Sequence, residues 1–370
     1  MQKMRVLGVV LGVALAVALC GAEGGVAQEQ ARGAAAVGPV VSSKTTEDAD
    51  SALETRLREI VQAHHGKVAM YAMQLNTGRV AALDADAVVQ TASVIKLTIL
   101  FEAMEQVREG KAHWDDKITL QPGDAVSGSG ILLFLDAPQT LTLKDVLTLM
   151  IVMSDNTATN LAIDRIGLDA VNARAEWMGL KDTHLYKKIG KPATGPMPDD
   201  QAKFGLGKST PREMARVMER IGLCELDGSG ETVAGPLSEK DAAICGVAMK
   251  MLRNQFYRDT IPRYLEKLDA TETGSGIASK TGSLNAVRAD VAIVAGKTGP
   301  MVLSIFTYDN EDTGWTAENE GEVTIAKLAR AVVEAWSPEG IDGKTLAPGL
   351  GLRTKSDGTV SPRSGVAASN

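Results

Sequence analysis

Apolar positions along the chain predict strands near both ends of one domain. Helical periodicity over residues 51–66 is followed by two runs of strand character, 67–75 and 80–85, joined by the turn sequence NTGR. Three more strand-like runs come much later and precede a last helix: the strands are expected at 275–282, 288–296 and 301–309, and the helix at 319–336. This order predicts a sheet assembled from both ends of the domain.

Between these two sets of strands, apolar residues recur at helical spacing. A long apolar helix is expected over about 93–107, and residues 142–153 form another after a threonine cap. The sequence TPRE that begins at Thr210 is a capping box with proline at the first helical position. Further helices are expected at 157–165, 169–178 and 238–252. The predicted fold class is therefore α+β, an α/β sandwich. Its antiparallel five-stranded sheet is built from both chain ends, with helices on its faces and an inserted all-helical subdomain.

The N-terminus has the layout of a secretory signal. Lys3 and Arg5 precede an apolar run over residues 6–19, and small residues up to Ala27 separate that run from polar sequence. Because the run is shorter than a comfortable membrane span, we expect cleavage after Ala27, a secreted or periplasmic protein and no stable membrane span. Cys20 raises a lipoprotein anchor as a minor alternative, which the bulky residue before it disfavours.

These features divide the chain into four parts. Residues 1–27 are expected to be a signal peptide, and residues 28–50, which are small and polar without periodicity, a flexible linker. Residues 51–337 are expected to form one continuous domain. Residues 338–370 are rich in glycine, proline, serine and lysine and are expected to form a disordered C-terminal tail.

Charge and cysteine content narrow the possible functions. The formal net charge of −7 provides no electrostatic footprint for a nucleic-acid partner. After signal removal two cysteines remain, Cys224 and Cys245, and either a disulfide or two separate buried thiols fits an oxidising compartment. The 4 histidines show no metal-ligand spacing with cysteine or aspartate, so we expect no metal and no cofactor.

Ser93 and Lys96 are the first candidate for chemistry. Their spacing stacks them on one face at the start of an apolar helix, one turn apart. A serine hydroxyl becomes a nucleophile when a neighbouring base takes its proton, and a desolvated lysine with a lowered pKa can serve as that base. A Ser-x-x-Lys motif is expected by chance in this composition, so its weight depends on the motifs that accompany it.

The tripeptide Ser154-Asp155-Asn156 is a much rarer pattern. It follows an apolar helix, where side chains can turn into a cleft. Ser154 is placed to relay a proton to a leaving nitrogen, and Asn156 to hold a substrate amide. The alternative is a plain helix cap, because serine, aspartate and asparagine all favour such positions.

The tripeptide Lys-Thr-Gly occurs twice. Lys280 ends one strand-like run and is followed by another, whereas Lys297 lies in the sequence GKTGP between two strands. The second context is typical of an exposed hairpin turn. We therefore assign chemistry to the copy at Lys280 and a turn to the copy at Lys297.

Taken in chain order, S-x-x-K, S-D-N and K-T-G form the motif set of class A β-lactamases and penicillin-binding proteins. The chain resembles that superfamily over about residues 51–337, and the separation of Ser93 from Ser154 is similar to class A spacing. The sequences MSDNTATN and STPREMARVM also look like the class A pattern. The resemblance implies that Ser93 is the acylated nucleophile, Lys96 its proton partner, and Ser154 the proton donor to the departing nitrogen.

The same resemblance implies a set of substrate-binding residues. Asn156 would bind the amide side chain of the substrate, and Lys280 and Thr281 its carboxylate, with Arg288 supporting that carboxylate. The backbone N–H groups of Ser283 and of the nucleophile would form the oxyanion hole.

One stretch departs from the class A pattern. Class A enzymes carry a glutamate in the loop before the Thr-Pro helix, which activates the water that removes the acyl group. Alignment from the upstream side puts Gly190 at that position, and counting back from the Thr-Pro helix puts Thr194 there. No glutamate occurs between Glu176 and Glu213. The resemblance therefore implies intact acylation and a deacylation step that lacks its usual base.

Two further details bear on this departure. Asp199 or Asp200 could reach the site from the loop, although their place after a proline favours a solvated turn. Leu284 stands where many relatives have a glycine beside the active-site strand, which would narrow the site or alter the choice of substrate.

These observations lead to three hypotheses about the function. The leading hypothesis is a monomeric, secreted class A-type β-lactamase that acts on small-molecule β-lactams. The second is a D,D-peptidase of cell-wall metabolism that uses the same residues on peptides ending in D-alanine. The third is a binding module that is acylated once and stays so. The absent base favours the second and third, and the motif spacing and single-domain length favour the first.

Overall fold

The structure is a computed structural model that describes residues 44–45, 48–193, 195–226, 237–352 and 363–364. The predicted signal peptide, Cys20 and most of the predicted linker lie outside the described residues. Within the described residues, no helix is both long enough and apolar enough to cross a membrane.

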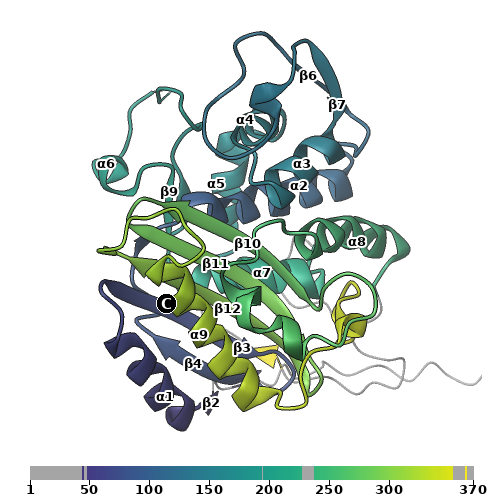
Figure 1. Cartoon of the computed structure of the whole chain (residues 1–370). Coiled ribbons are helices and arrows are strands. Elements are labelled where there is room, and N and C mark those ends of the chain that lie inside the picture. Colours follow the sequence, from purple (N-terminus) through teal and green to yellow (C-terminus); the bar gives the residue numbers. More distant parts are fainter. Residues whose placement is uncertain (1–43, 46–47, 194, 227–236, 353–362, 365–370) are drawn as a thin grey trace, which may run out of the picture. The chain divides into compact units, whose positions relative to one another are not determined.

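A six-stranded sheet runs through the domain (Figure 1). In spatial order its strands are β10 (Ile277–Leu284), β11 (Val287–Gly296), β12 (Gly299–Tyr308), β3 (Lys67–Gln74), β4 (Arg79–Leu83) and β2 (Asp48–Ala49). The first five pair antiparallel, and β12 beside β3 joins the two ends of the domain as predicted.

The prediction of a purely antiparallel five-stranded sheet is wrong at one edge. The two-residue strand β2 pairs parallel with β4, which makes the sheet mixed. Its pairing is made by backbone groups, with the Asp50 N–H donating to the Val80 carbonyl at 2.8 Å. Such a short strand has exposed side chains and no alternating apolar pattern, so the sequence analysis assigned its residues to the linker.

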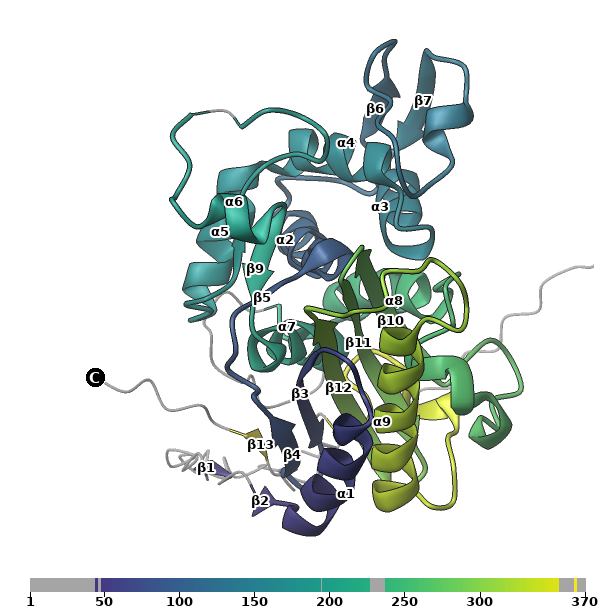
Figure 2. The ribbon, with the colours of Figure 1, turned by 60° about the vertical axis from the view of Figure 1, so that its left-hand side comes forward.

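Helices cover both faces of the sheet (Figure 2). On one face α9 (Glu320–Trp336) packs against β11 and β12, and α1 (Ser51–Gln62) lies beside α9. On the other face α7 (Pro211–Leu223) packs against β3, β11 and β12. Helix α8 (Glu239–Arg253) packs against β10. This sandwich confirms the predicted layering.

The inserted part is built around a buried helix, α2 (Lys96–Glu109), most of whose side chains are buried. Around it lie α3 (Leu143–Val152), α4 (Asn156–Ile166) and α5 (Leu168–Trp177). Contrary to the prediction of an all-helical subdomain, β6 (Lys117–Leu120) and β7 (Gln139–Thr142) form a small antiparallel pair. A long connection separates these strands, so no hairpin turn signals them in the sequence.

Shorter elements complete the chain: β1 (Lys44–Thr45), β5 (Val89–Gln90), β8 (His184–Leu185), β9 (Gly207–Ser209), β13 (Arg363–Ser364), α6 (Gln201–Phe204) and the 3₁₀ turns η1 (Ala92–Ile95), η2 (Leu132–Phe134), η3 (Ile261–Tyr264), η4 (Glu266–Leu268) and η5 (Gly343–Thr345). Strands β5, β9 and β8 form a small antiparallel sheet. The pair β1 and β13 is parallel.

The boundary predicted at residue 337 is too early. Ile341, Leu346 and Leu350 are almost fully buried, with exposed fractions of 0%, 3% and 1%. The Ile341 N–H donates to the Leu268 carbonyl at 2.8 Å. Residues 338–352 therefore belong to the domain, because a few apolar side chains in a glycine- and proline-rich stretch suffice to anchor it. Residues 353–362 and 365–370 of the predicted tail lie outside the described residues.

The open question about the two cysteines is answered by the structure. Cys224, which caps the C-terminus of α7, is disulfide-bonded to Cys245 in α8, with Cα atoms 5.7 Å apart. The bond ties a helix that packs on the sheet to one that packs against α2 and α3.

Ile341→Ala tests whether the segment 338–352 stabilises the domain. We expect the free energy of unfolding to fall by about 2–5 kcal/mol, because the substitution empties a fully buried site. Chemical denaturation measures this change. Lys344→Ala, at a side chain that is 79% exposed, is the matched control and should change stability by less than about 0.5 kcal/mol. Equal effects of the two substitutions would contradict the assignment.

Candidate active site

Ser93 lies in the 3₁₀ turn η1, just before α2, and not in the first turn of an α-helix as predicted. The residue before it, Ala92, has a φ of 46°, which is uncommon for a residue with a Cβ. Val94 and Ile95 are fully buried and fix the turn, while Ser93 itself stays partly exposed. The turn therefore presents a single hydroxyl at the surface of a rigid support.

Two buried lysine side chains meet at the hydroxyl of Ser154. Lys96 Nζ donates to Ser154 Oγ at 3.2 Å, and Lys280 Nζ donates to the same oxygen at 3.0 Å. Lys96 also donates to the Ser154 carbonyl at 2.7 Å and to Asn156 Oδ1 at 3.1 Å. Both lysines are 0% exposed. The three motifs found in the sequence are thus joined in one hydrogen-bond network.

Burial determines how these lysines hold their protons. Desolvation lowers the pKa of Lys96 well below its usual range, and the charge of Lys280 lowers it further, while Asp155 opposes the shift. Desolvation also lowers the pKa of Lys280, to about 7, and Asp290 opposes that shift. A lysine that loses its proton near neutral pH can accept one from a neighbouring hydroxyl.

The tripeptide Ser154-Asp155-Asn156 forms the turn that carries this hydroxyl. Ser154 has a φ of 52°, again in the left-handed region. Asp155 caps α4 through the Ala158 N–H at 2.8 Å, and its other oxygen accepts the N–H of Ile131 at 2.7 Å. The predicted cap is therefore real, and the same aspartate also holds the loop that contains Ser129.

The side chain of Asn156 already makes two hydrogen bonds, one to Lys96 and one to this loop. Its Oδ1 accepts from Lys96, and its Nδ2 donates to the Ser127 carbonyl at 3.0 Å. One N–H of the amide group and one lone pair of Oδ1 remain for a substrate.

The strand β10 brings the Lys-Thr-Gly motif against the turn that carries Ser93. A Cβ at Gly282 would lie 2.9 Å from the Ser93 nitrogen, 2.9 Å from the Thr91 carbonyl oxygen and 3.0 Å from the Val94 nitrogen. Only glycine allows this close approach. Because β10 is at the edge of the sheet, Thr281 and Ser283 also line the space next to Ser93.

A cavity of about 290 Å³ opens at Ser93. Its lining residues come from η1, β10, the loop before η2, the turn before α4, the segment before η3, the segment before α9 and the first turn of α9: Ser93, Ser129, Ser154, Tyr257, Asp259, Thr260, Thr281, Gly282, Ser283, Trp315, Thr316, Ala317 and Glu322. Four of the predicted residues therefore share one cavity: Ser93, Ser154, Thr281 and Ser283. Lys96 and Lys280 lie behind its wall.

Arg288 does not line this cavity. Its side chain is 0% exposed, and its Nε donates to Glu322 Oε1 at 3.1 Å. Its other nitrogens donate to backbone carbonyls, including those of Leu284 and Gly314, and its guanidinium lies 4.8 Å from the ring centroid of Trp315. Arg288 thus positions two cavity residues, Trp315 and Glu322. Leu284, next to Ser283, is 39% exposed and does not line the cavity.

The second Lys-Thr-Gly copy is a turn, as predicted. Lys297 and Thr298 are exposed between β11 and β12, and the Thr298 carbonyl accepts from Asn76 at 2.9 Å.

The loop that lacks an acid is held against α4. Asn160 accepts the Ile189 N–H at 2.8 Å and donates to the Ile189 carbonyl at 2.9 Å. Gly190 follows directly with a φ of 63°, and Thr194 lies outside the described residues. The sequence alignment thus missed Ile189 as the anchored residue, because only the contact with Asn160 identifies it.

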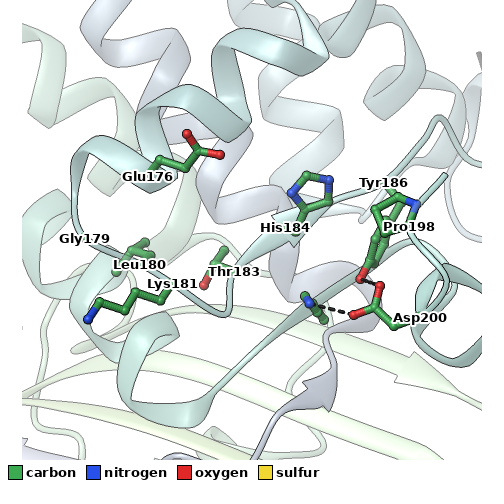
Figure 3. A pocket seen from close by; sticks show the side chains of 10 residues that line it. Glu176, Gly179, Leu180, Lys181, Thr183, His184, Tyr186, Pro198 and Asp200 are labelled. Carbon is green, nitrogen blue, oxygen red and sulfur yellow. Dashed lines mark hydrogen bonds and ion pairs between the residues drawn. The ribbon is translucent and has the colours of Figure 1, made fainter. Parts of the chain in front are cut away.

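Neither aspartate of the loop lines the cavity at Ser93. Asp200 lines a separate cavity of about 370 Å³, where it accepts from Tyr186 at 2.7 Å and from Lys208 at 2.6 Å (Figure 3). Asp199 is exposed. In the described residues, the acids that do line the Ser93 cavity are Asp259 and Glu322.

Sequence reasoning missed the other lining residues, among them Tyr257, Asp259, Trp315 and Glu322. They lie in loops or at a helix start and carry no motif. Glu322 occupies the first turn of α9, where an acid is expected for helix stability alone. No local signal separates that role from a place in the cavity.

Comparison with known proteins agrees with the motif set. Residues 52–336 match the model of the β-lactamase enzyme family. No curated protein matches the chain. A β-lactamase from Sphaerobacter thermophilus DSM 20745 has a similar solved structure, with 29% identity, coverage of 77% of this chain and 97% of that chain, and a TM-score of 0.62.

Another similar fold is that of PBP-A. It shows 24% identity over 80% of this chain and 100% of that chain, with a TM-score of 0.64. A mutant of PBP-A, solved as an acyl-enzyme complex with penicillin G, is 23% identical over 80% of this chain and 99% of that chain, with a TM-score of 0.63.

Gly282→Ala tests the close approach of β10 to Ser93. We expect acylation of Ser93 by penicillin G to slow about 100-fold, because the new methyl group must push the strand away from the nucleophile. Intact mass at timed intervals measures the adduct. Gly246→Ala, where the nearest atom is Pro348 Cγ at 3.8 Å, is the matched control and should leave the rate unchanged. A similar rate in both variants would show that the contact is not needed.

Proposed function

The chain belongs to the β-lactamase enzyme family, and from its site we propose that it is a secreted serine hydrolase that opens β-lactam amide bonds through an acyl-enzyme at Ser93. The observation that carries this proposal is the hydroxyl of Ser154 between two buried lysines, at 3.2 Å from Lys96 Nζ and 3.0 Å from Lys280 Nζ. Such a network is suited to moving one proton from a nucleophile to a leaving nitrogen.

The acylation proposed here uses this network, with Ser93 in the same cavity as Ser154. Neutral Lys96 takes the proton of Ser93, whose Oγ forms a bond to the carbonyl carbon of the substrate. The bond from that carbon to nitrogen breaks, and the nitrogen takes the proton of the Ser154 hydroxyl. Lys96 returns the proton it took to Ser154 across their 3.2 Å hydrogen bond. Once Lys96 carries the proton of Ser93, its three N–H groups match its three acceptors, which are Ser154 Oγ, the Ser154 carbonyl and Asn156 Oδ1. Lys280 donates to the same Oγ, which leaves the O–H of Ser154 to point into the cavity.

The substrate is held on both sides of the bond that breaks. The N–H groups of Ser93 and Ser283 stabilise the oxyanion. Asn156 binds the amide on the acyl side through its remaining N–H and lone pair. On the nitrogen side, Thr281 and the charge of Lys280 bind the carboxylate, and Arg288 supports that side through Trp315 and Glu322.

Deacylation is expected to be slow. The described part of the 185–198 stretch brings no carboxylate to the cavity, and Asp200 is held by Tyr186 and Lys208 elsewhere. A positioned general base is worth about 100- to 10,000-fold in rate. The acyl-enzyme should therefore accumulate, with Lys96 as the remaining group able to activate water.

The absent base also favours a second function, that of a D,D-peptidase that uses the same residues on peptides ending in D-alanine. The penicillin G acyl-enzyme of a PBP-A mutant supports the general idea that this fold can hold a stable adduct. In either case we propose a monomer that is exported by its N-terminal signal and acts on a small molecule without a cofactor.

A chromogenic cephalosporin mixed with residues 28–370 tests the function. We expect a burst of one equivalent of colour, then slow turnover, with an adduct on Ser93 by intact mass. Ser93→Ala should abolish burst and adduct, and Ser283→Ala, which keeps the backbone N–H, should retain both. Turnover without a burst would indicate an efficient base. Neither colour nor adduct would rule out both β-lactam functions.

The pH dependence of acylation tests the role of the lysines. Lys96 must be neutral and Lys280 charged, so the second-order acylation constant of the free enzyme should fall as pH rises through about 7, where Lys280 loses its proton. Lys280→Arg should move this fall to higher pH, because arginine keeps its charge. Stopped-flow acylation between pH 5 and pH 9 measures the profile. The same alkaline fall in both proteins would contradict the assignment.

A further inference from the structure

The cavity at Ser93 carries an acidic end that the proposed reaction does not use. The charged residues among its described lining are Asp259 and Glu322, and both are acids. The positive groups Lys280 and Arg288 lie behind the wall, each 0% exposed, and Arg263, which donates to the Ala317 carbonyl, is paired with Glu318 at 2.7 Å. A substrate that fills the cavity therefore meets carboxylates.

This acidic end lies on the nitrogen side of the bond that breaks. The lining includes Ser154, the proton donor to nitrogen, and Thr281, which binds the carboxylate, whereas Asn156 on the acyl side does not line the cavity. The segment 257–260 lies beside Thr281, because Thr260 donates to Asp290, which is the partner of Thr281 in the sheet. The segment 315–317 and Glu322 complete this part of the lining. Whatever the leaving nitrogen carries must extend between these two segments.

Aromatic rings stand on both walls of this end. Tyr257 and Trp315 line the cavity with exposed fractions of 36% and 66%, and Phe256 packs edge-on against Tyr257 at 5.6 Å between ring centroids. Arg288 stacks on Trp315 at 4.8 Å from its ring centroid. A carboxylate together with electron-rich rings is a combination that attracts a cation.

Both walls are fixed before a ligand arrives. Thr260 Oγ1 donates to the buried carboxylate of Asp290 at 2.6 Å, which anchors one wall to β11. The other wall is held by Asn319, whose Nδ2 donates to the Gly314 carbonyl at 3.0 Å, and by Arg263, which donates to the Ala317 carbonyl. A site that is already ordered binds without the cost of ordering its walls.

The two carboxylates are not equally neutralised. Glu322 is paired with Arg288 at 3.1 Å, whereas Asp259 is exposed and, in the described part of the chain, has no ion-pair partner. Burial raises the pKa of Glu322, Arg288 opposes that shift, and the charge of Asp259 adds to it. The two acids therefore repel each other, and a cation bound beside Asp259 would relieve this repulsion.

We propose that Asp259, with the rings of Tyr257 and Trp315, forms a subsite for a positively charged group on the leaving-nitrogen side of the substrate. This inference rests on the proposed function. The preferred acyl donor then carries a carboxylate next to the nitrogen, bound at Thr281, and a cation further out, bound at Asp259. Ser93 Oγ still bonds to the carbonyl carbon, the carbon–nitrogen bond breaks, and the proton lost by Ser93 is replaced on the nitrogen through Ser154.

Two cephalosporins with the same acyl side chain test the subsite. One carries a pyridinium on the methylene at C3 and the other an uncharged acetoxy group. The acylation constants of both are measured by stopped flow, and their ratio is compared between proteins, which removes the difference in intrinsic reactivity. Asp259→Asn should lower the ratio of pyridinium to acetoxy about fivefold. Added salt should lower it in the unmodified protein, because salt screens exposed charges.

Asp169→Asn is the matched control, since it removes an exposed aspartate from the first turn of α5 and should leave the ratio unchanged. Trp315→Ala should lower the ratio as well, and Phe134→Ala, at a ring that is 77% exposed and does not line the cavity, should not. An unchanged ratio in Asp259→Asn, or an equal fall in Asp169→Asn, overturns the inference and leaves the proposed function standing. Failure of both compounds to acylate Ser93 overturns the proposed function, and the subsite with it.

Discussion

Burying two ammonium groups next to each other costs free energy, because both lose their hydration and they repel each other. The hydroxyl of Ser154 lies between the two groups and accepts a hydrogen bond from each. Lys96 and Lys280 come from a buried helix and an edge strand, and both are shielded from water. Desolvation lowers the pKa of both side chains, to about 7 for Lys280, and the charge of Lys280 lowers the pKa of Lys96 further. The backbone of Ser154, with its left-handed φ of 52°, is held in place by the same contacts. Ser154 is therefore a buried residue with a strained backbone, and its hydroxyl is at the centre of the hydrogen-bond network.

The fold holds this network between the sheet and the inserted part of the domain. Strand β10 ends the sheet, and the absence of a side chain at Gly282 lets it lie against the turn that carries Ser93. Asp155 fixes the opposite wall by capping α4 and binding the loop of Ile131. Because each wall is set by buried or capped residues, the nucleophile and its proton network stay in register without a bound ligand.

Positive and negative side chains occupy different places around the cavity. Positive charge is buried behind Ser154, and two carboxylates line the cavity, that of exposed Asp259 and that of largely buried Glu322. The acid-free loop over residues 185–198 is tied to Asn160 through the backbone of Ile189. Acids are thus present in the cavity, and the proposed subsite gives Asp259 a role in the choice of substrate.

The sequence by itself determined the strands, the main helices and the motif residues, since periodicity and caps are local and the motifs have fixed spacing. Only the tertiary structure decided the pairing of β2, the burial of Ile341 and the cavity role of Glu322. A two-residue strand is made by backbone groups, an isolated apolar residue shows no period, and an acid in a first helical turn has a sufficient local reason to be there. These features depend on contacts between distant segments, which leave no mark on neighbouring positions of the chain.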